Sequence, residues 1–421
     1  MNHCPSIRLR FLPVCAILFL AAAFLRAADP AAHGFDPERL KRLDHVIQTE
    51  IDGQRLAGAV MIVKRNGEDV VLKAYGSHDV EGGVPMRTDS IFRIASMSKA
   101  VTTIAALMLY EEGRFMLNDP VSKFIPEFAK SVVAVPPPAG SPSDVKYVTV
   151  PAKRPISIRD LMTHTAGLTY GDFLAIEDYK KARLHGWYLM DHDETIGDAM
   201  KRLATLPLSA QPGEAFNYGY GTDLLGYLVE VVSGMPLDRF FEERILQPLK
   251  MTDTGFYLPK EKAARLAVVY SVEGGKLVRK EDSSRTDFID GPRKLFSGGA
   301  GLYSTASDYG RLLQMLLNGG ELDGVRLLSP RTVALMHENH TGNLFSWDTQ
   351  SFGLGFWVND RPGRYGELVG EGAYGWGSAY FPQYFVDPKE KLVAVLMCQL
   401  RATGGSNLNQ RFKVTIYQAL K

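Results

Sequence analysis

The sequence Ser96-Met97-Ser98-Lys99 leads directly into the apolar run Ala100–Tyr110. Because this run is apolar on nearly all sides and is followed by Gly113, it predicts a buried helix with a glycine cap. Residues three apart share one face of a helix, so we expect Ser96 and Lys99 to lie one above the other. A serine hydroxyl is a weak nucleophile that needs a nearby base, and a desolvated lysine can supply one. The pair therefore predicts nucleophile Ser96 with Lys99 as its base.

The spacing Ser-x-x-Lys is weak evidence when it stands alone. Roughly one such pair is expected by chance in a chain of this length. A second pair, Ser143 and Lys146, lies in a proline-rich stretch that predicts a loop and no catalytic role. The alternative for Ser96 is a helix N-cap followed by a surface lysine.

Composition and charge exclude several classes of protein. The 421 residues are 45% hydrophobic and 23% charged, which is typical of a globular chain of two or three domains. The net charge is +1 and no basic stripe is present, so we expect neither a nucleic-acid partner nor a polybasic membrane surface.

The N-terminus predicts an export signal. Arg8 and Arg10 precede the apolar run Phe11–Phe24, and small residues follow at Ala27 and Ala28. This order is typical of a signal peptide, which we place at residues 1–28. The alternative is a membrane anchor, but the run is short for a span of ~20 residues. We therefore expect a mature chain without a stable membrane span, exported to the periplasm or the exterior.

Cysteine use agrees with a chain that folds without disulfides. Of the three cysteines, Cys4 and Cys15 fall in the leader and Cys398 lies in an apolar, strand-like run. The mature chain can therefore form no intrachain disulfide, and we expect Cys398 to be a buried structural thiol.

The hydrophobic pattern predicts strands and helices at both ends of the chain around a mostly helical middle. Expected helices, besides 100–110, cover 35–52, 158–163, 195–206, 222–233, 237–246, 308–317 with Ser307 as its N-cap, and 407–420. Expected strands cover 57–65, 69–75, 379–386 and 391–398. The simplest arrangement is a sheet-containing α/β domain from residues 29–120 and 294–421, with 121–293 inserted as a mostly helical domain.

Four stretches in order resemble the serine β-lactamase-related superfamily, with class C β-lactamases and family VIII carboxylesterases as the nearest branches. They are Ile91–Lys99, Leu161–Leu168, Pro212–Tyr218 and Ser297–Thr305. The resemblance implies a β-lactamase/transpeptidase-like fold of the α/β (α+β) class. In that fold an antiparallel sheet is flanked by N- and C-terminal helices and carries an inserted, mostly helical domain.

The same resemblance implies a second proton-transfer residue, a tyrosine at the head of a Tyr-x-Asn motif. Tyr218 fits this place, because it follows Pro212-Gly213 and precedes Leu224. A phenol beside an ammonium can shuttle protons. Tyr220 stands where the family has its asparagine, so we expect Tyr220 to contact substrate.

The family's third motif, Lys-Thr-Gly, is absent from this sequence. His340-Thr341-Gly342 comes too early in the chain, and we interpret it as a loop. Trp376-Gly377-Ser378 has the right order and resembles the Trp-Gly-Gly form of the esterase branch, so we expect these residues to bind substrate. The resemblance places the oxyanion hole at the backbone N–H groups of Ser96 and Ala379.

Other candidate sites have simpler explanations. Four adjacent polar residues, Asp191–Glu194, cannot all converge on one ion, so we expect a solvated loop before a helix and no metal. His164 is expected to brace a loop, and nothing in the sequence calls for a cofactor.

These observations predict an exported serine hydrolase that transfers the acyl group of a small-molecule ester or amide to Ser96. A β-lactamase and a D-amino-acid peptidase or transpeptidase remain alternatives with the same catalytic parts. A non-catalytic, penicillin-binding-like sensor is a third, and the oligomeric state stays open.

Overall fold

The computed structural model describes Met1 and residues 27–281, 286–345, 350–363 and 366–421. The predicted leader lies almost entirely outside the described residues and stays a prediction. None of the helices that are described has the length and apolar character needed to cross a bilayer.

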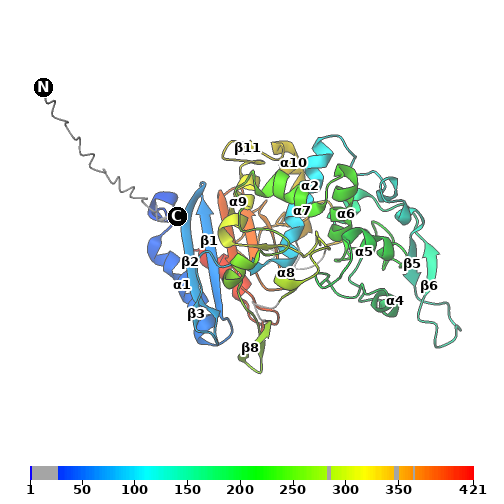
Figure 1. Ribbon diagram of the computed structural model, residues 1–421, viewed down its shortest axis with the longest axis horizontal. Helices are drawn as coiled ribbons and strands as arrows, with labels where there is room; N and C mark the ends of the chain where they lie inside the picture. The colour runs from blue at the N-terminus through cyan, green and yellow to red at the C-terminus, as the bar shows by residue number, and fades with distance from the viewer. Residues whose placement is uncertain (2–26, 282–285, 346–349, 364–365) are drawn as a thin grey trace.

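One eight-stranded antiparallel sheet joins the two ends of the chain (Figure 1). Its strands, in sheet order, are β12 Ser351–Phe352, β13 Trp357–Val358, β14 Tyr374–Gly377, β15 Gln383–Asp387, β16 Leu392–Met397, β1 Gly58–Arg65, β2 Glu68–Asp79 and β3 Val84–Pro85. The pairing of β1 with β16 brings residues near the N-terminus beside residues near the C-terminus. The predicted fold class is confirmed.

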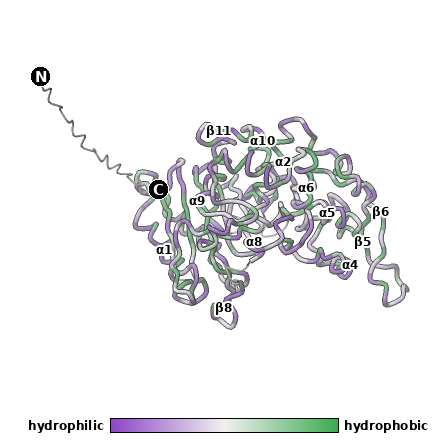
Figure 2. The backbone as a smooth tube through the Cα atoms, viewed as in Figure 1, coloured by the Kyte–Doolittle hydropathy of each residue, from purple (hydrophilic) through white to green (hydrophobic). Residues whose placement is uncertain are grey.

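The central strands are apolar on both faces because each face is covered. In β1, Val60 and Ile62 belong to one hydrophobic core, whereas Met61 and Val63 belong to the other. Helices α1 (Pro37–Asp52) and α11 (Leu408–Tyr417) cover the second face, and α9 (Ala306–Leu317) packs on the first. Along α1, hydrophilic residues, purple in Figure 2, alternate with the buried apolar ones.

The middle of the chain contains most of the remaining helices. They are α3 Ile158–Met162, α4 Ile176–Lys181, α5 Ile196–Leu203, α6 Gly221–Ser233, α7 Leu237–Phe241 and α8 Asp287–Asp290, and α10 Pro330–Met336 follows later. Two hairpins were not predicted there: β5 (Val132–Val135) with β6 (Val148–Pro151), and β7 (Val269–Glu273) with β8 (Lys276–Glu281). The second hairpin turns at Gly274 and Gly275, both with positive φ. That turn signal was available in the sequence. The domain boundaries stay a prediction.

Helix α2 (Ser98–Glu111) runs between the sheet and α6, and its residues 98–109 are all buried (Figure 1). The expectation that Ser96 lies within this helix is wrong in detail. Ser96 belongs to a short 3-10 turn, Ala95–Met97, that leads into the helix.

Two further element boundaries differ from expectation. The N-cap of α9 is Thr305, whose side chain accepts a hydrogen bond from the Asp308 N–H, and Ser307 lies inside the helix. Strand β15 begins only at Gln383, because Phe381 donates to the Ser378 carbonyl and closes a turn ahead of the strand.

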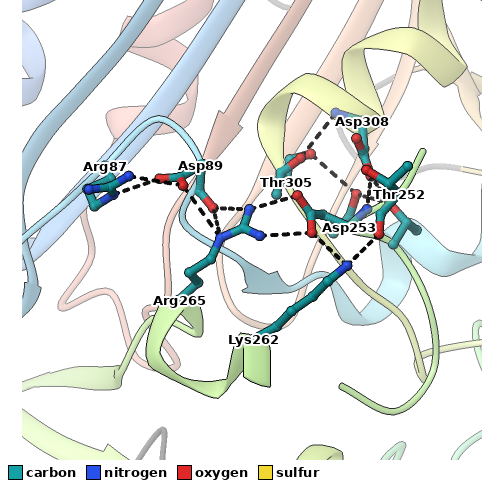
Figure 3. A network of polar contacts seen from close by, with 10 residues as sticks. Arg87, Asp89, Thr252, Asp253, Lys262, Arg265, Thr305 and Asp308 are labelled. Atoms are coloured by element: carbon teal, nitrogen blue, oxygen red, sulfur yellow. Dashed lines mark hydrogen bonds and ion pairs between the residues drawn. The ribbon is translucent and has the colours of Figure 1, made fainter. Parts of the chain in front are cut away.

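A network of charged side chains fastens the segment around Asp253 to the rest of the molecule (Figure 3). Arg265 forms an ion pair with Asp253 (2.7 Å) and donates to the Asp89 carbonyl (2.6 Å). The Asp308 carboxylate accepts hydrogen bonds from the Asp253 N–H (2.7 Å) and the Thr254 hydroxyl (2.9 Å). Burial raises the pKa of Asp308 to about 6, although these hydrogen bonds oppose the shift.

Asp308 is expected to make folding stability depend on pH. The folded state keeps the proton up to about pH 6, whereas the unfolded chain releases it near pH 3.8. The stabilisation from this group is present below that lower value and is lost as pH rises through the folded-state value. The stability advantage of the wild type over Asp308→Asn should therefore fall by about 1–3 kcal/mol between pH 4 and pH 7. Urea unfolding at both pH values measures this, and a difference independent of pH would contradict it.

Candidate active site

Ser96 lines a cavity of about 750 Å³, and Lys99 follows it three residues later in the first turn of α2. The 3-10 turn leaves Ser96 partly exposed in the cavity lining, whereas Lys99, in the first turn of α2, is only 2% exposed. The turn has a tight backbone, since Ala95 has a φ of 36°. The Ser96 hydroxyl is therefore accessible from the cavity, whereas the Lys99 amine is buried.

Three side chains or carbonyls surround the Lys99 amine. Its Nζ donates to the Gly299 carbonyl (2.8 Å) and to the Tyr170 hydroxyl (3.1 Å). It also lies 4.7 Å from the centre of the Tyr218 ring. The structure therefore brings Lys99 and Tyr218 together from α2 and from the loop before α6, as the resemblance implied.

Tyr170 is a site residue that sequence reasoning missed. It lines the cavity, and its ring lies 5.8 Å from that of Tyr218. Burial raises its pKa well above 10, so the phenol stays protonated at neutral pH. Its place two residues after the Leu161–Leu168 stretch was the available signal.

Tyr218 is held by aromatic neighbours and one hydrogen bond. The Trp376 indole N–H donates to the Tyr218 oxygen over 3.1 Å, and the two ring centres lie 5.4 Å apart. The His164 ring lies 4.6 Å from the Tyr218 ring on another side. Trp376 therefore contributes a hydrogen-bond donor as well as the apolar ring expected from the sequence, and His164 braces the tyrosine.

The backbone N–H groups predicted to form the oxyanion hole lie where the end of β14 meets the 3-10 turn of Ser96. Strand β14 packs against the 3-10 turn of Ser96, and Gly377, Ser378 and Ala379 line the cavity with it. Within the described part of the chain, neither the Ser96 nor the Ala379 backbone N–H donates a hydrogen bond. Both donors are thus available to a substrate oxygen.

The expectation that Tyr220 contacts substrate is corrected by the structure. Tyr220 is fully buried, and its hydroxyl donates to the Gly186 carbonyl (2.5 Å). Its ring packs edge-on against Tyr170. Tyr170 belongs to the cavity lining, whereas Tyr220 does not. Burial and this bond make Tyr220 a support for Tyr170.

The cavity is also lined by large rings and polar side chains. The rings come from Trp187, Phe345, Trp357, Trp376 and Tyr384. Among the described lining residues, Lys413 is the cation, and it forms an ion pair with Glu367 (2.8 Å). A substrate carboxylate therefore meets no unpaired cation in this lining.

The remaining candidates do not form a site. Lys146 donates to the backbone carbonyl of Ser143 in an exposed loop. Glu194 pairs with Arg202 and with His192 beside the start of α5, and no cluster of the described residues could hold a metal ion. Cys398 is fully buried, as predicted.

Comparisons with known proteins agree with this geometry. The family model described as Beta-lactamase matches residues 43–415. Esterase EstB of Burkholderia gladioli is 32% identical over 90% of this chain and 95% of its own length. A putative D-alanyl-D-alanine carboxypeptidase of Escherichia coli K12 is 30% identical over 91% of this chain and 87% of its own.

A solved structure extends the similarity to three dimensions. It is that of EstCE1, a hydrolase with promiscuous acyltransferase activity, which superposes with a TM-score of 0.77 at 27% identity. The alignment covers 90% of this chain and 99% of EstCE1. The chain therefore belongs to the Beta-lactamase family.

Proposed function

We propose that this protein cleaves small-molecule esters through an acyl-enzyme on Ser96. The observation that carries the proposal is that Ser96, Tyr218 and Ala379 line one cavity and that the Lys99 amine lies beside the Tyr218 ring. The similarity to an esterase and to a hydrolase supports the same reaction class.

The contacts assign each group a step. The Ser96 oxygen attacks the ester carbonyl as its proton passes to the Lys99 and Tyr218 pair, and the carbonyl becomes an oxyanion held by the Ser96 and Ala379 N–H groups. Collapse of this intermediate breaks the C–O bond, and the pair returns the proton to the leaving alcohol. Water then attacks the acyl-enzyme by the reverse sequence, releasing the acid and free Ser96.

The Trp376 indole supports this relay. Its N–H donates to the Tyr218 oxygen, which stabilises any negative charge on that oxygen while the proton is in transit. The Tyr170 hydroxyl holds Lys99 from the other side. The relay is thus fixed by contacts from strand β14 and from the loop that carries Tyr170.

Substrate preference follows from the missing cation. In the lactamase branch the lysine of the third motif favours a β-lactam carboxylate, whereas Trp376 occupies that place here. A carboxylate that enters without a partner loses its hydration, while a neutral ester loses nothing. Catalytic efficiency on a short-chain nitrophenyl ester should exceed that on any penicillin or cephalosporin by at least about 100-fold, or ~2.7 kcal/mol.

A turnover panel on one preparation tests this choice. It should contain p-nitrophenyl esters, a chromogenic cephalosporin and D-amino-acid amides. Comparable efficiency on the cephalosporin would make the chain a β-lactamase. Preference for the amides would favour the peptidase named by the Escherichia coli relative, and no turnover would favour a sensor.

We also propose that the protein is exported. Purified exported protein should begin near Asp29 and contain one free thiol, at Cys398. N-terminal sequencing and thiol titration check both. A retained Met1 in membrane-bound material would instead favour an anchor.

A further inference from the structure

The fully buried carboxyl group of Asp223 is linked to Lys99 through one residue. Asp223 belongs to the first turn of α6 and is 1% exposed. Its Oδ1 accepts hydrogen bonds from the Ser297 hydroxyl (2.5 Å) and the Gly299 N–H (3.1 Å). The carbonyl of the same Gly299 accepts the Lys99 amine (2.8 Å). A single residue, Gly299, thus links the carboxylate to the lysine.

The segment between them is shaped to fit this gap. The Thr102 hydroxyl, one turn after Lys99 on α2, donates to the Gly298 carbonyl (2.7 Å). A Cβ on Gly299 would lie 2.3 Å from Asp223 Oδ2, and one on Gly298 would lie 3.0 Å from Thr102. The two glycines therefore allow the segment to sit between α2 and α6, where it contacts both Lys99 and Asp223.

A purely structural role would not require a carboxyl group at Asp223. An asparagine could accept the same two hydrogen bonds with its amide oxygen. The second oxygen, Oδ2, is buried and has no hydrogen-bond partner among the described residues. An ionised carboxylate in such a place is costly unless a positive charge lies near it. Burial raises the pKa of Asp223, and the charge of Lys99 opposes that shift more than any hydrogen bond does.

The other titratable side chains around Lys99 supply no negative charge beside it. Burial, with a smaller contribution from the charge of Lys99, holds the pKa of His164 well below 6.5, so the ring is neutral. Burial likewise raises the pKa of Tyr170 and Tyr220. Tyr218 lies in the proton relay itself. Among these neighbours Asp223 is the acidic side chain, and it is linked to Lys99 through Gly299.

We propose that Asp223 is a positioning residue for Lys99: through Gly299 it fixes the amine beside Tyr170 and Tyr218, and its charge sets how tightly the amine holds a proton. The proposal rests on the role of Lys99 in the proposed function. Removing the carboxylate charge makes the ammonium easier to deprotonate, so the free base forms at lower pH.

The test is the pH profile of kcat/KM on p-nitrophenyl acetate for the full chain and for Asp223→Asn. The ascending limb should move to lower pH by about one unit. The maximal kcat should fall about tenfold, with KM changed less than threefold. Asp308→Asn is the matched control, because it removes another buried carboxylate, one that belongs to the separate network of Figure 3. The stability of Asp308→Asn should differ from that of the wild type, whereas the ascending limb of its pH profile should stay in place.

Two further variants keep the outcomes distinct. Ser297→Ala removes one hydrogen bond to Asp223 and keeps the charge, so it should lower kcat a few-fold and leave the limb in place. An unshifted limb in folded Asp223→Asn, or an unchanged kcat in Ser297→Ala, would overturn the proposal. If Lys99→Ala retains full activity, the proposed function itself fails, and that result is independent of Asp223.

Discussion

Ser96→Ala is expected to lower ester turnover by at least ~10⁴-fold while leaving the fold intact. Ser96 lies in the cavity lining, and Lys99, three residues later, is buried. The second Ser-x-x-Lys pair, Ser143 and Lys146, lies in an exposed loop and does not have this arrangement. The variant should also resist labelling by a phosphonate inhibitor. Initial rates and intact-mass spectrometry measure both effects.

The second Ser-x-x-Lys pair provides the matched control. Ser143 and Lys146 have the same spacing but lie in an exposed loop, away from the cavity. Ser143→Ala should therefore keep wild-type turnover and labelling. A phosphonate adduct on Ser96→Ala would refute the assignment of the nucleophile.

Lys99→Ala and Tyr218→Phe are each expected to lower kcat by about 100-fold or more, because each removes one member of the proton relay. The amine lies 4.7 Å from the centre of the tyrosine ring, close enough for both groups to serve the same proton in the proposed relay. The double variant should then be much less impaired than the product of the single losses. Steady-state kinetics on one nitrophenyl ester give all four values.

Each outcome of this cycle separates two mechanisms. Multiplicative losses would mean that Lys99 and Tyr218 have independent roles. A normal rate in Tyr218→Phe would move the second proton transfer to another group, for which Tyr170 is the structural candidate because it accepts a hydrogen bond from Lys99. Circular dichroism of each variant controls for misfolding.

The sequence was sufficient to predict the architecture because its strongest signals are long apolar runs. The apolar run after Lys99 and the strands near both termini are buried by long-range contacts that leave a clear hydrophobic pattern, and they appear in the structure close to their predicted bounds. The hairpin at Gly274 was missed because its second strand, β8, consists mostly of charged residues and carries little apolar signal.

Contacts between distant segments explain the other differences. Tyr220 matched a position in a motif, but motif position does not reveal that its hydroxyl reaches the Gly186 carbonyl and turns away from the cavity. Tyr170 contacts Lys99 across 71 residues of the chain, and Asp223 is linked to Lys99 only through Gly299, so these contacts are visible only in three dimensions. The hydrogen bond from Trp376 to Tyr218 spans 158 residues and is likewise visible only in three dimensions.

The most direct test of the central claim is to identify the residue that carries the acyl group during turnover. The protein is mixed with a p-nitrophenyl ester, quenched in acid within one turnover, digested with trypsin and analysed by mass spectrometry. The account predicts an acyl group on the peptide Ile94–Lys99, with fragment ions that assign it to Ser96 and not to the fully buried Ser98. The acyl group should disappear when the ester is exhausted. Turnover without any adduct on this peptide, or an adduct on another residue that forms and decays at the rate of turnover, would contradict the account.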